Sequence, residues 1–210
     1  MKNRMLDLPV KNKNGISKLS YSQINLFKNE KREYYKRYIL KEPFKGNAYT
    51  DFGTKVGTAL EHNDFTAFDP EEKETLQKCT RLDVFEKKIN INFDQFVLVG
   101  YIDSISDDLS TIIDYKTGGA GKESNYLKDD YTQLCLYALG IRQEYGITPD
   151  KAYVNFIRRE GNAFRGQKLK VGKECLMLPI DITYNKLKSV YWETIKIAHQ
   201  IEFFYQQHRS

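Results

Sequence analysis

Two short segments of the chain carry residue types that could do chemistry together. Residues 100–103 end in Asp103, and residues 112–118 contain Asp114 and Lys116 at a spacing of two. Side chains alternate across a β-strand, so the carboxylate of Asp114 and the amine of Lys116 point to the same face. The spacing therefore predicts a pocket in which carboxylates lie beside an ammonium group.

Such a pocket suits metal-dependent hydrolysis. Two carboxylates that converge at the end of a sheet suit a hard divalent cation such as Mg²⁺, which takes oxygen ligands and keeps several waters. The ion makes a bound water easier to deprotonate and stabilises charge on a phosphoryl oxygen. Lys116 would add a compact positive charge or, with a depressed pKa, a base near the attacking water. The chemistry indicated is hydrolysis of a phosphodiester.

An Asp-x-Lys pair taken alone is more often an ordinary solvated ion pair, but the flanking sequence favours the functional interpretation. Residues 96–103 are apolar and β-branched enough for a buried strand, and residues 106–110 have the composition of a hairpin turn. Antiparallel pairing of the two strands would bring Asp103 toward Asp114. Thr-Gly-Gly follows Lys116 and is expected to end the strand.

The remaining pattern predicts an α/β fold with a mixed central sheet flanked by helices. Further strands are expected at residues 84–91 and 151–158. A helix over about residues 129–145, starting at either aspartate, would make the connection to the last of these strands a parallel crossover. Gln133 and Tyr137 are four residues apart and would share one face of that helix.

We expect a polar N-terminal arm, either frayed or docked, over residues 1–17, followed by a single domain over residues 18–210. Within it, a helical part at about 18–82 precedes the catalytic sheet and helix at about 83–160. A β extension and a C-terminal helix follow at about 161–208.

The helices expected outside the catalytic part include one that carries a basic stripe. Their ranges are about 20–40, 52–62, 70–82 and 183–207. The stripe consists of three cations four residues apart on the first helix: Lys28, Arg32 and Lys36. It is either a phosphate-contacting surface or a solvated face.

Four motifs follow one another along the chain. They are an opening helix at residues 19–39, a glycine-rich segment at 53–62, Gly100-x-x-Asp103 with Asp114-x-Lys116, and Gln133-x-x-x-Tyr137. In this order they resemble the PD-(D/E)xK nuclease superfamily, in particular its RecB-like branch. That branch includes the CRISPR-associated RecB-like nucleases and the mitochondrial genome maintenance exonuclease. The resemblance covers most of the chain and implies a restriction-endonuclease-like fold.

Carried over by position, the resemblance implies a Mg²⁺ or Mn²⁺ site. His62, which ends the segment similar to the family's Gly-x-x-x-His motif, would be a metal ligand together with Asp103 and Asp114. The backbone carbonyl of Tyr115 would join them, and Lys116 would be the catalytic lysine.

Further residues take supporting roles by the same resemblance. Gln133 and Tyr137 would line the site and position the catalytic lysine or the DNA backbone, and Glu86 is a candidate for an accessory acidic role. Four cations are candidates for contacts with DNA: Lys28, Arg32, Lys36 and Lys122.

The cysteines mark one departure from the resemblance. Several relatives hold an iron–sulfur cluster on four cysteines, whereas this chain has only Cys79, Cys135 and Cys175, widely scattered in sequence. Three thiols without close spacing cannot complete such a site, so no iron–sulfur cluster is expected.

Composition and length indicate an ordinary globular domain. A chain of 210 residues can bury a sizeable core without disulfides, and its net charge of +5 favours polyanionic partners without distinguishing DNA from RNA. No apolar run approaches the ~20 residues of a membrane span, and the N-terminus lacks an apolar signal core. Together with sparse cysteine, this predicts an intracellular, reducing compartment, the cytoplasm or nucleoid, and no membrane contact.

The function expected from these observations is metal-dependent hydrolysis of DNA. By resemblance, it would be an exonuclease in recombination, repair or replication. The chain shows no helicase motif, so any unwinding would come from a helicase or a recombination or replication partner. The rival interpretation is a non-catalytic nucleic-acid-binding subunit that retains the fold. A third, an RNA-directed or small-nucleotide phosphohydrolase, shares the same chemistry.

Overall fold

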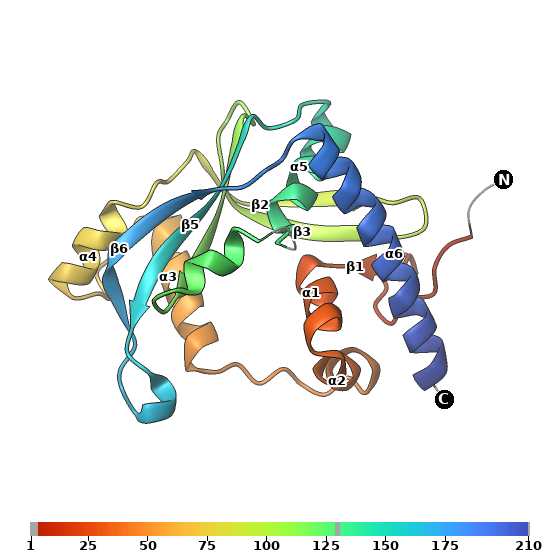
Figure 1. Ribbon diagram of the computed structural model, residues 1–210, viewed down its shortest axis with the longest axis horizontal. Helices are drawn as coiled ribbons and strands as arrows, with labels where there is room; N and C mark the ends of the chain where they lie inside the picture. The colour runs from red at the N-terminus through yellow and green to blue at the C-terminus, as the bar shows by residue number, and fades with distance from the viewer. Residues whose placement is uncertain (1–3, 129–130, 210) are drawn as a thin grey trace.

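A six-stranded mixed sheet forms the centre of the fold (Figure 1). The computed structural model describes residues 4–128 and 131–209. The strand order is β1-β3-β4-β5-β6, and β2 pairs with the other edge of β3. The strands are β1 (Lys18–Leu19), β2 (Val84–Asn92), β3 (Val97–Ile105), β4 (Thr111–Gly118), β5 (Lys151–Glu160) and β6 (Lys170–Pro179). The predicted hairpin and the predicted parallel crossover are both confirmed, because β3 and β4 are antiparallel and β4 and β5 are parallel.

Helices flank this sheet. The α-helices are α1 (Tyr21–Asn29), α2 (Lys31–Tyr34), α3 (Ala48–His62), α4 (Pro70–Gln77), α5 (Gln133–Tyr145) and α6 (Tyr184–His208). A π-helical turn, η1 (Tyr35–Ile39), extends α2, and two 3₁₀ turns are η2 (Lys122–Tyr126) and η3 (Ala163–Arg165). The predicted mixed α/β fold is therefore confirmed.

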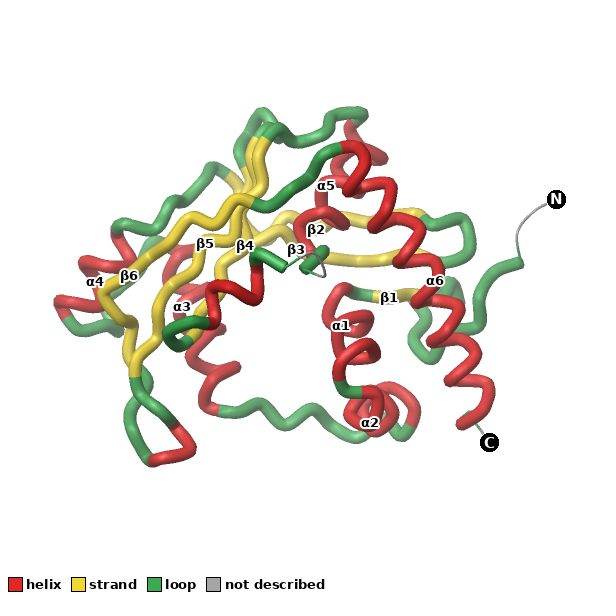
Figure 2. The backbone as a smooth tube through the Cα atoms, in the orientation of Figure 1, coloured by secondary structure: helices red, strands yellow, loops and turns green. Residues whose placement is uncertain are grey.

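The two central strands separate soon after the hairpin that joins them. β3 and β4 pair only through Ser104 with Ile113 and Ile105 with Ile112. Beyond these pairs, β4 continues beside β5 along its whole length, while β3 continues beside β2 and meets β1 at its far end. Figure 2 shows the two arms of the sheet diverging from this point. We call the gap that results the β3–β4 opening.

Two hydrophobic clusters pack on opposite faces of the sheet. The larger cluster joins α1, α5 and α6 to the sheet and includes Phe156 of β5. The smaller cluster joins α3 and α4 to the sheet and includes Ile157, the next residue of β5. Because neighbouring residues of a strand face opposite sides, the two clusters lie on either side of β5. Leu6 and Leu8 also belong to the larger cluster, so this part of the N-terminal segment packs against the domain.

Local sequence explains where several helices begin and end. Ser20 caps α1 by accepting a hydrogen bond from the backbone of Gln23. The long first helix expected at residues 20–40 is instead interrupted at Glu30, whose backbone is not helical (φ −143°). α4 ends at Gln77, short of the expected residue 82. α5 begins at Gln133, and the expected start at residues 129 or 130 lies outside the described residues.

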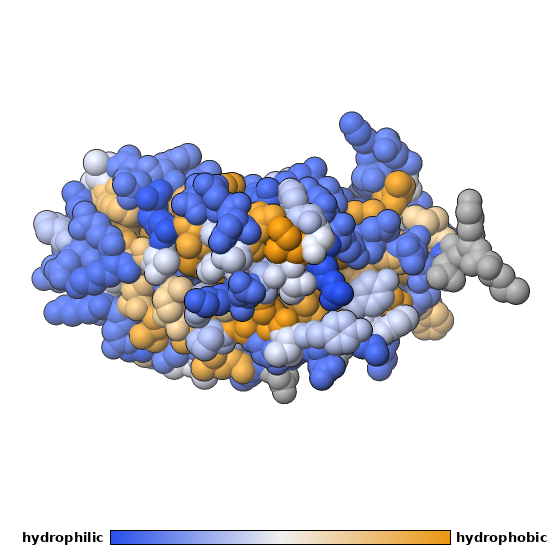
Figure 3. Space-filling model, turned by 90° about the horizontal axis from the view of Figure 1, so that it is seen from above, coloured by the Kyte–Doolittle hydropathy of each residue, from blue (hydrophilic) through white to orange (hydrophobic). Residues whose placement is uncertain are grey.

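Figure 3 shows one face of the molecule, where hydrophilic residues cover most of the surface and apolar residues gather toward the middle. Within the described residues, none of the helices has the length and apolar character needed to span a membrane.

Candidate active site

The β3–β4 opening brings together the three residues of the acid and lysine motif. In β4, the Lys116 amine lies 2.5 Å from Asp114 Oδ2. In β3, Asp103 Oδ2 accepts a 2.7 Å hydrogen bond from the backbone N–H of Tyr115. That bond links the two strands beyond their last backbone pair. Both acids therefore lie where the sheet opens, with the lysine beside them.

Asp114 is fully buried, and among the described residues only its Oδ2 atom has a partner. Oδ2 meets the Lys116 amine and also accepts a 3.0 Å hydrogen bond from the Tyr131 hydroxyl. Oδ1 is buried without a hydrogen-bond partner among the described residues. A buried carboxylate oxygen without a donor is costly, and such exceptions in native proteins call for a ligand, an ion or a water. This oxygen is thus a suitable ligand for a hard cation.

The electrostatics of the site keep the lysine charged. Burial lowers the pKa of Lys116, but the negative charges of Asp114 and Asp103 outweigh burial, so the net shift is upward. The alternative of a lysine base with a depressed pKa is therefore not favoured by the charges around Lys116. Burial, and after it the charge of Asp114, raises the pKa of Asp103 from its ordinary value of 3.8 to about 7. A bound cation would relieve this crowding of acids.

A pocket of about 250 Å³ adjoins Asp103 on the side of α3. The face of α3 that lines it carries Gly53, Gly57 and Glu61, which are spaced four residues apart. A methyl group at Gly57 would meet no atom within 4 Å, so this face leaves open space. The whole lining is Gly53, Thr54, Gly57, Glu61, Phe85, Glu86, Asp103 and Tyr115.

Glu86 enters this pocket through an unusual backbone conformation. The register of β2 on β3 pairs Phe85 with Ser104 and Lys87 with Ile102, which places Glu86 opposite Asp103 between these two pairs. Glu86 has a φ of +49°, in the left-handed region. Such a conformation costs of order 1–3 kcal/mol for a residue other than glycine and clusters at functional sites.

The charge environment of Glu86 agrees with its position in the pocket. Partial burial, followed by the charges of Glu61 and Asp114, raises the pKa of Glu86. A carboxyl group held at this point of the sheet fits the accessory acidic role expected for it.

The structure does not bring His62 to the site. His62 is the exposed last residue of α3 and is absent from the pocket lining, whereas its neighbour Glu61 faces the pocket. The Arg81 guanidinium fixes this end of the helix, because it donates hydrogen bonds of 2.5 and 3.1 Å to the carbonyls of Leu60 and Glu61. A one-residue step along a helix turns a side chain by about 100°, which is why the neighbour of His62 takes its expected place.

The predicted amide and tyrosine of α5 do lie together. Gln133 Nε2 donates a 2.8 Å hydrogen bond to the Tyr137 hydroxyl. Tyr137 packs against Gly100 of β3, where a methyl group would come within 2.4 Å of its ring. Burial, and then the charge of Asp114, raises the pKa of Tyr137, so its hydroxyl stays protonated.

Sequence reasoning missed Tyr131, whose hydroxyl lies between Asp114 and Gln133. Its hydroxyl contacts Asp114 Oδ2 at 3.0 Å and lies 3.4 Å from Gln133 Oε1. Tyr131 precedes α5, so helical periodicity gave no signal for it. Sequence reasoning also missed Glu61, although its spacing from Gly53 and Gly57 could have indicated that all three residues share one face of α3.

A second pocket, of about 420 Å³, reaches Lys116 from the face of α1 and η2. The described residues that line it are tyrosines, amides and lysines: Tyr21, Asn25, Asn29, Lys116, Asn125, Tyr126, Lys128 and Tyr131. Lys116 thus lines this second pocket, whereas Asp103 lines the pocket beside α3.

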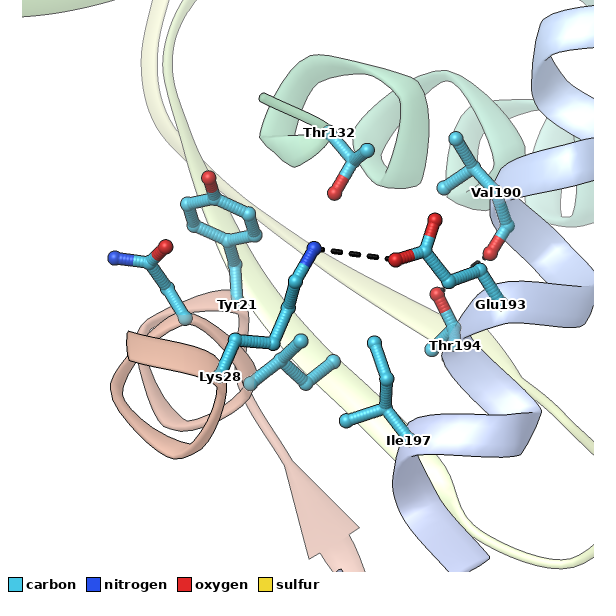
Figure 4. A pocket seen from close by; sticks show the side chains of 9 residues that line it. Tyr21, Lys28, Thr132, Val190, Glu193, Thr194 and Ile197 are labelled. Carbon is cyan, nitrogen blue, oxygen red and sulfur yellow. Dashed lines mark hydrogen bonds and ion pairs between the residues drawn. The ribbon is translucent and has the colours of Figure 1, made fainter. Parts of the chain in front are cut away.

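The predicted basic stripe is not continuous. Lys28 points toward α6, where its amine lies 3.1 Å from Glu193 in a small cleft (Figure 4). The break at Glu30 separates Lys28 from the exposed Arg32, and Lys36 pairs with Glu33 at 2.7 Å. A fourth predicted cation, Lys122, is exposed at the start of η2, just after the end of β4.

The acids around the opening fit a hard cation by their chemistry. In residues 4–128 and 131–209, no group of three or more His, Cys, Asp or Glu side chains is already gathered at metal-binding distances. Four carboxylates of the described part of the chain nevertheless lie around the opening, and one of them has a buried oxygen that no described residue pairs. Side-chain movement would be needed to bring them onto one ion. They are Glu61, Glu86, Asp103 and Asp114.

A family model and one crystal structure agree with this architecture. The model of the PD-(D/E)XK nuclease superfamily matches residues 65–174, more than half of the chain. A crystal structure from Eubacterium rectale, provisionally named an exonuclease, aligns with a TM-score of 0.61 and 11% identity over 90% of this chain and 82% of that chain. The structure of SSO0001 aligns with a TM-score of 0.41 and 14% identity over 96% of this chain and 81% of that chain. No curated protein matches the chain significantly.

The six-stranded mixed sheet flanked by helices defines an α/β protein. The chain belongs to the PD-(D/E)XK nuclease superfamily. Membership indicates a nucleic-acid substrate and phosphodiester hydrolysis.

Proposed function

We propose that the protein is a divalent-metal-dependent deoxyribonuclease of the RecB-like branch. One observation carries the proposal: Asp103, Asp114 and Lys116 come together at the β3–β4 opening, and Asp114 offers a buried oxygen that no described residue pairs. Carboxylates without a cation repel phosphate, so a site built only for binding nucleic acid would not converge them.

Mg²⁺ or Mn²⁺ would be held by Asp103 and Asp114, with the Tyr115 carbonyl as a further ligand. Glu86 and Glu61 line the adjoining pocket together with Asp103, and Glu61 replaces His62 in our assignment. When bound, the ion supplies Lewis-acid stabilisation of phosphate charge and lowers the pKa of a water.

The other residues act by charge and position. Lys116 remains an ammonium group, so it would neutralise charge on the phosphate and orient the attacking water. Tyr131 donates to Asp114 and would keep this carboxylate in place. Gln133 and Tyr137, held to each other, would limit how far Lys116 moves.

Exonuclease action on DNA in recombination, repair or replication is the finer part of the proposal. It rests on the RecB-like order of motifs and on the provisional name of the Eubacterium rectale protein. A helicase or another replication or recombination protein is the partner that this role requires.

The test is to incubate the purified protein with linear and circular DNA, single- and double-stranded, with Mg²⁺, Mn²⁺ or a chelator. We expect linear DNA to be degraded only when metal is present. Asp114→Asn should abolish cleavage, while Asp107→Asn, which changes an exposed acid of the same hairpin, should leave cleavage unchanged. Full activity of a pure Asp114→Asn sample would refute the site assignment, and cleavage of circular DNA would refute the exonuclease role.

The rival function is a non-catalytic nucleic-acid-binding subunit. It predicts DNA binding that does not depend on metal, with no turnover under Mg²⁺ or Mn²⁺. Cleavage of RNA in preference to DNA would instead favour an RNA-directed enzyme with the same chemistry.

A further inference from the structure

Two of the three cysteines, far apart in sequence, meet in space. Cys79 Sγ lies 2.9 Å from Cys175 Sγ, although 96 positions separate the residues. Cys79 follows α4 and is buried, whereas Cys175 is half-buried in β6. The third thiol, Cys135, is buried elsewhere, against the carbonyl of Asp181. The scattering in sequence therefore conceals a thiol pair.

The two thiols differ in their surroundings. Cys175 Sγ accepts a 3.1 Å hydrogen bond from the Asn155 amide of β5. The thiol of Cys79 and the Asn155 amide together lower the pKa of Cys175, against the opposing effect of burial. The pKa of Cys79 is raised by its contact with Cys175 and by burial. Cys175 is thus both the more accessible thiol and the better thiolate, which is the pattern of an attacking cysteine beside a resolving one.

The segment of residues 79–82, which we call the Cys79 segment, contacts three elements of the candidate site. The carbonyl of Thr80 accepts a 2.8 Å hydrogen bond from the Tyr115 hydroxyl of β4. Arg81 holds the end of α3, as described above. The backbone N–H of Leu82 donates a 2.9 Å hydrogen bond to Ser104, next to Asp103 in β3.

We propose that Cys79 and Cys175 are a redox-active dithiol that closes to a disulfide and ties the Cys79 segment to β6. The oxidant is a low-molecular-weight disulfide such as oxidised glutathione. The Cys175 thiolate attacks one of its sulfurs, forms a mixed disulfide and releases one glutathione thiolate. Cys79 then loses its proton, attacks the Cys175 sulfur and releases the second glutathione. Two cysteine thiols are oxidised, one small disulfide is reduced to two thiols, and the two protons end on them.

The geometry requires little movement for this reaction. A disulfide has sulfurs about 2.05 Å apart, so atoms now in contact need only a small approach. The cross-link would close a long loop, and long loops are those whose closure restricts the unfolded chain most. It would also restrain the hydrogen bonds that the Cys79 segment makes to α3, β3 and β4. This inference does not depend on the proposed nuclease activity.

The first test is a peptide map of the full-length protein after treatment with oxidised glutathione. We expect one cross-linked peptide pair, containing Cys79 and Cys175, that separates on reduction, with the protein two hydrogen atoms lighter before reduction. Cys135→Ser should give the same map. A Cys135 cross-link, or three free thiols after treatment, would overturn the proposal without any variant having to fold.

The single variants assign the attacking thiol. Cys79→Ser should accumulate one glutathione on Cys175, because the resolving thiol is missing. Cys175→Ser should take up none on Cys79 within the same time. The reverse pattern would overturn the assigned order of attack.

The effect on the site is read by hydrogen exchange of the oxidised and reduced proteins. We expect slower exchange in the peptide that contains Leu82 when the disulfide is closed, and a melting temperature higher by about 5 °C or more. Both changes should be absent in Cys175→Ser. If the melting temperature of the oxidised protein rises but hydrogen exchange in the peptide that contains Leu82 is unchanged, the disulfide does not restrain the Cys79 segment and this part of the proposal is refuted.

Discussion

At the scale of single residues, the site is an arrangement of charges that a cation would complete. Asp114 is buried with one oxygen unpartnered among the described residues, and Asp103 shares its space. Lys116 balances one negative charge, but a second remains. Proteins at such sites trade stability for function, so removing a charge here should stabilise the metal-free chain.

Asp103→Asn tests this trade. The pKa of Asp103 is raised to about 7 by burial and by Asp114, from 3.8. A carboxyl group with a raised pKa favours folding while it is protonated, and that contribution is lost as the pH rises from about 4 to 7. Asparagine cannot ionise, so the variant should gain stability over the wild type across this range. With a chelator present, we expect the advantage to level off above pH 7 at no more than about 4 kcal/mol.

Urea unfolding of both proteins at pH 4, 6 and 8 measures this difference. A constant offset across pH would mean that Asp103 titrates normally. The same substitution should remove metal-dependent cleavage, so the gain in stability and the loss of activity are expected together.

Tyr131→Phe tests the tyrosine that sequence reasoning missed. The change removes the hydroxyl that donates to Asp114 Oδ2 and keeps the ring, which packs edge-on against Tyr126 at 5.2 Å between centroids. A hydrogen bond to a charged group contributes about 1.5–3 kcal/mol, so cleavage should fall about tenfold or more. The matched control is Tyr126→Phe, because Tyr126 makes no described hydrogen bond to Asp114. Initial rates of cleavage at saturating Mn²⁺ compare both variants with the wild type. A Tyr131→Phe rate equal to that of the wild type would show that Tyr131 does not position Asp114.

Residue types and spacing predicted the pairing of Asp114 with Lys116, because alternation in a strand is a local property. Glu61 and Tyr131 were not predicted. Whether Glu61 or His62 faces the pocket depends on how α3 is rotated against the sheet, which packing of the smaller hydrophobic cluster decides. Tyr131 lies in a connection without periodicity, so only the tertiary fold places it.

At the scale of elements, α5 must lie close enough to β3 for Tyr137 and Gln133 to reach the site. Gly100 makes this approach possible, because a side chain there would overlap the Tyr137 ring. Gly100→Ala should therefore destabilise the protein by about 1–3 kcal/mol and reduce cleavage. Gly57→Ala places a methyl group in the open space of a helix interior, so it should be neutral or stabilising by up to about 1 kcal/mol.

Urea unfolding midpoints of the two variants give the comparison. Equal midpoints would mean that α5 can shift away from β3 at no cost, and that the close approach does not position Tyr137.

The elements themselves were largely predictable, but their limits were not. Hydrophobic patterns predicted β3, β4 and the parallel β5, since at least half of the residues of each strand are buried. The break at Glu30 and the separation of β3 from β4 have no comparable pattern. The edge of β3 that β4 leaves pairs at its far end with β1, and a strand of two residues carries too little pattern to predict.

At the scale of the whole molecule, the β3–β4 opening lies between two arms of the sheet that pack against different parts of the molecule. One arm packs with α1, α5 and α6, and the other extends between the two hydrophobic clusters. Direct pairing between β3 and β4 consists of two residue pairs. Asp103 comes from one arm and Asp114 from the other, so an ion bound by both would join the arms.

Metal binding should therefore stabilise the entire fold. A ligand that binds only the native state adds RT ln(1 + [L]/Kd), which is about 2.7 kcal/mol at a hundredfold excess over Kd. For a chain of 210 residues this corresponds to a rise in melting temperature of about 5–10 °C. Mn²⁺ must compete with the proton on Asp103, whose pKa is raised to about 7, so the rise should be larger at pH 8 than at pH 6.

Differential scanning fluorimetry with and without Mn²⁺ at the two pH values measures the effect. Asp114→Asn should lose most of the rise because it removes a ligand from one arm, while Asp107→Asn should keep it. A rise of the same size in Asp114→Asn would place the ion elsewhere. A rise in the wild type that is smaller at pH 8 than at pH 6 would show that Asp103 does not bind the ion, because the proton would then not be its competitor.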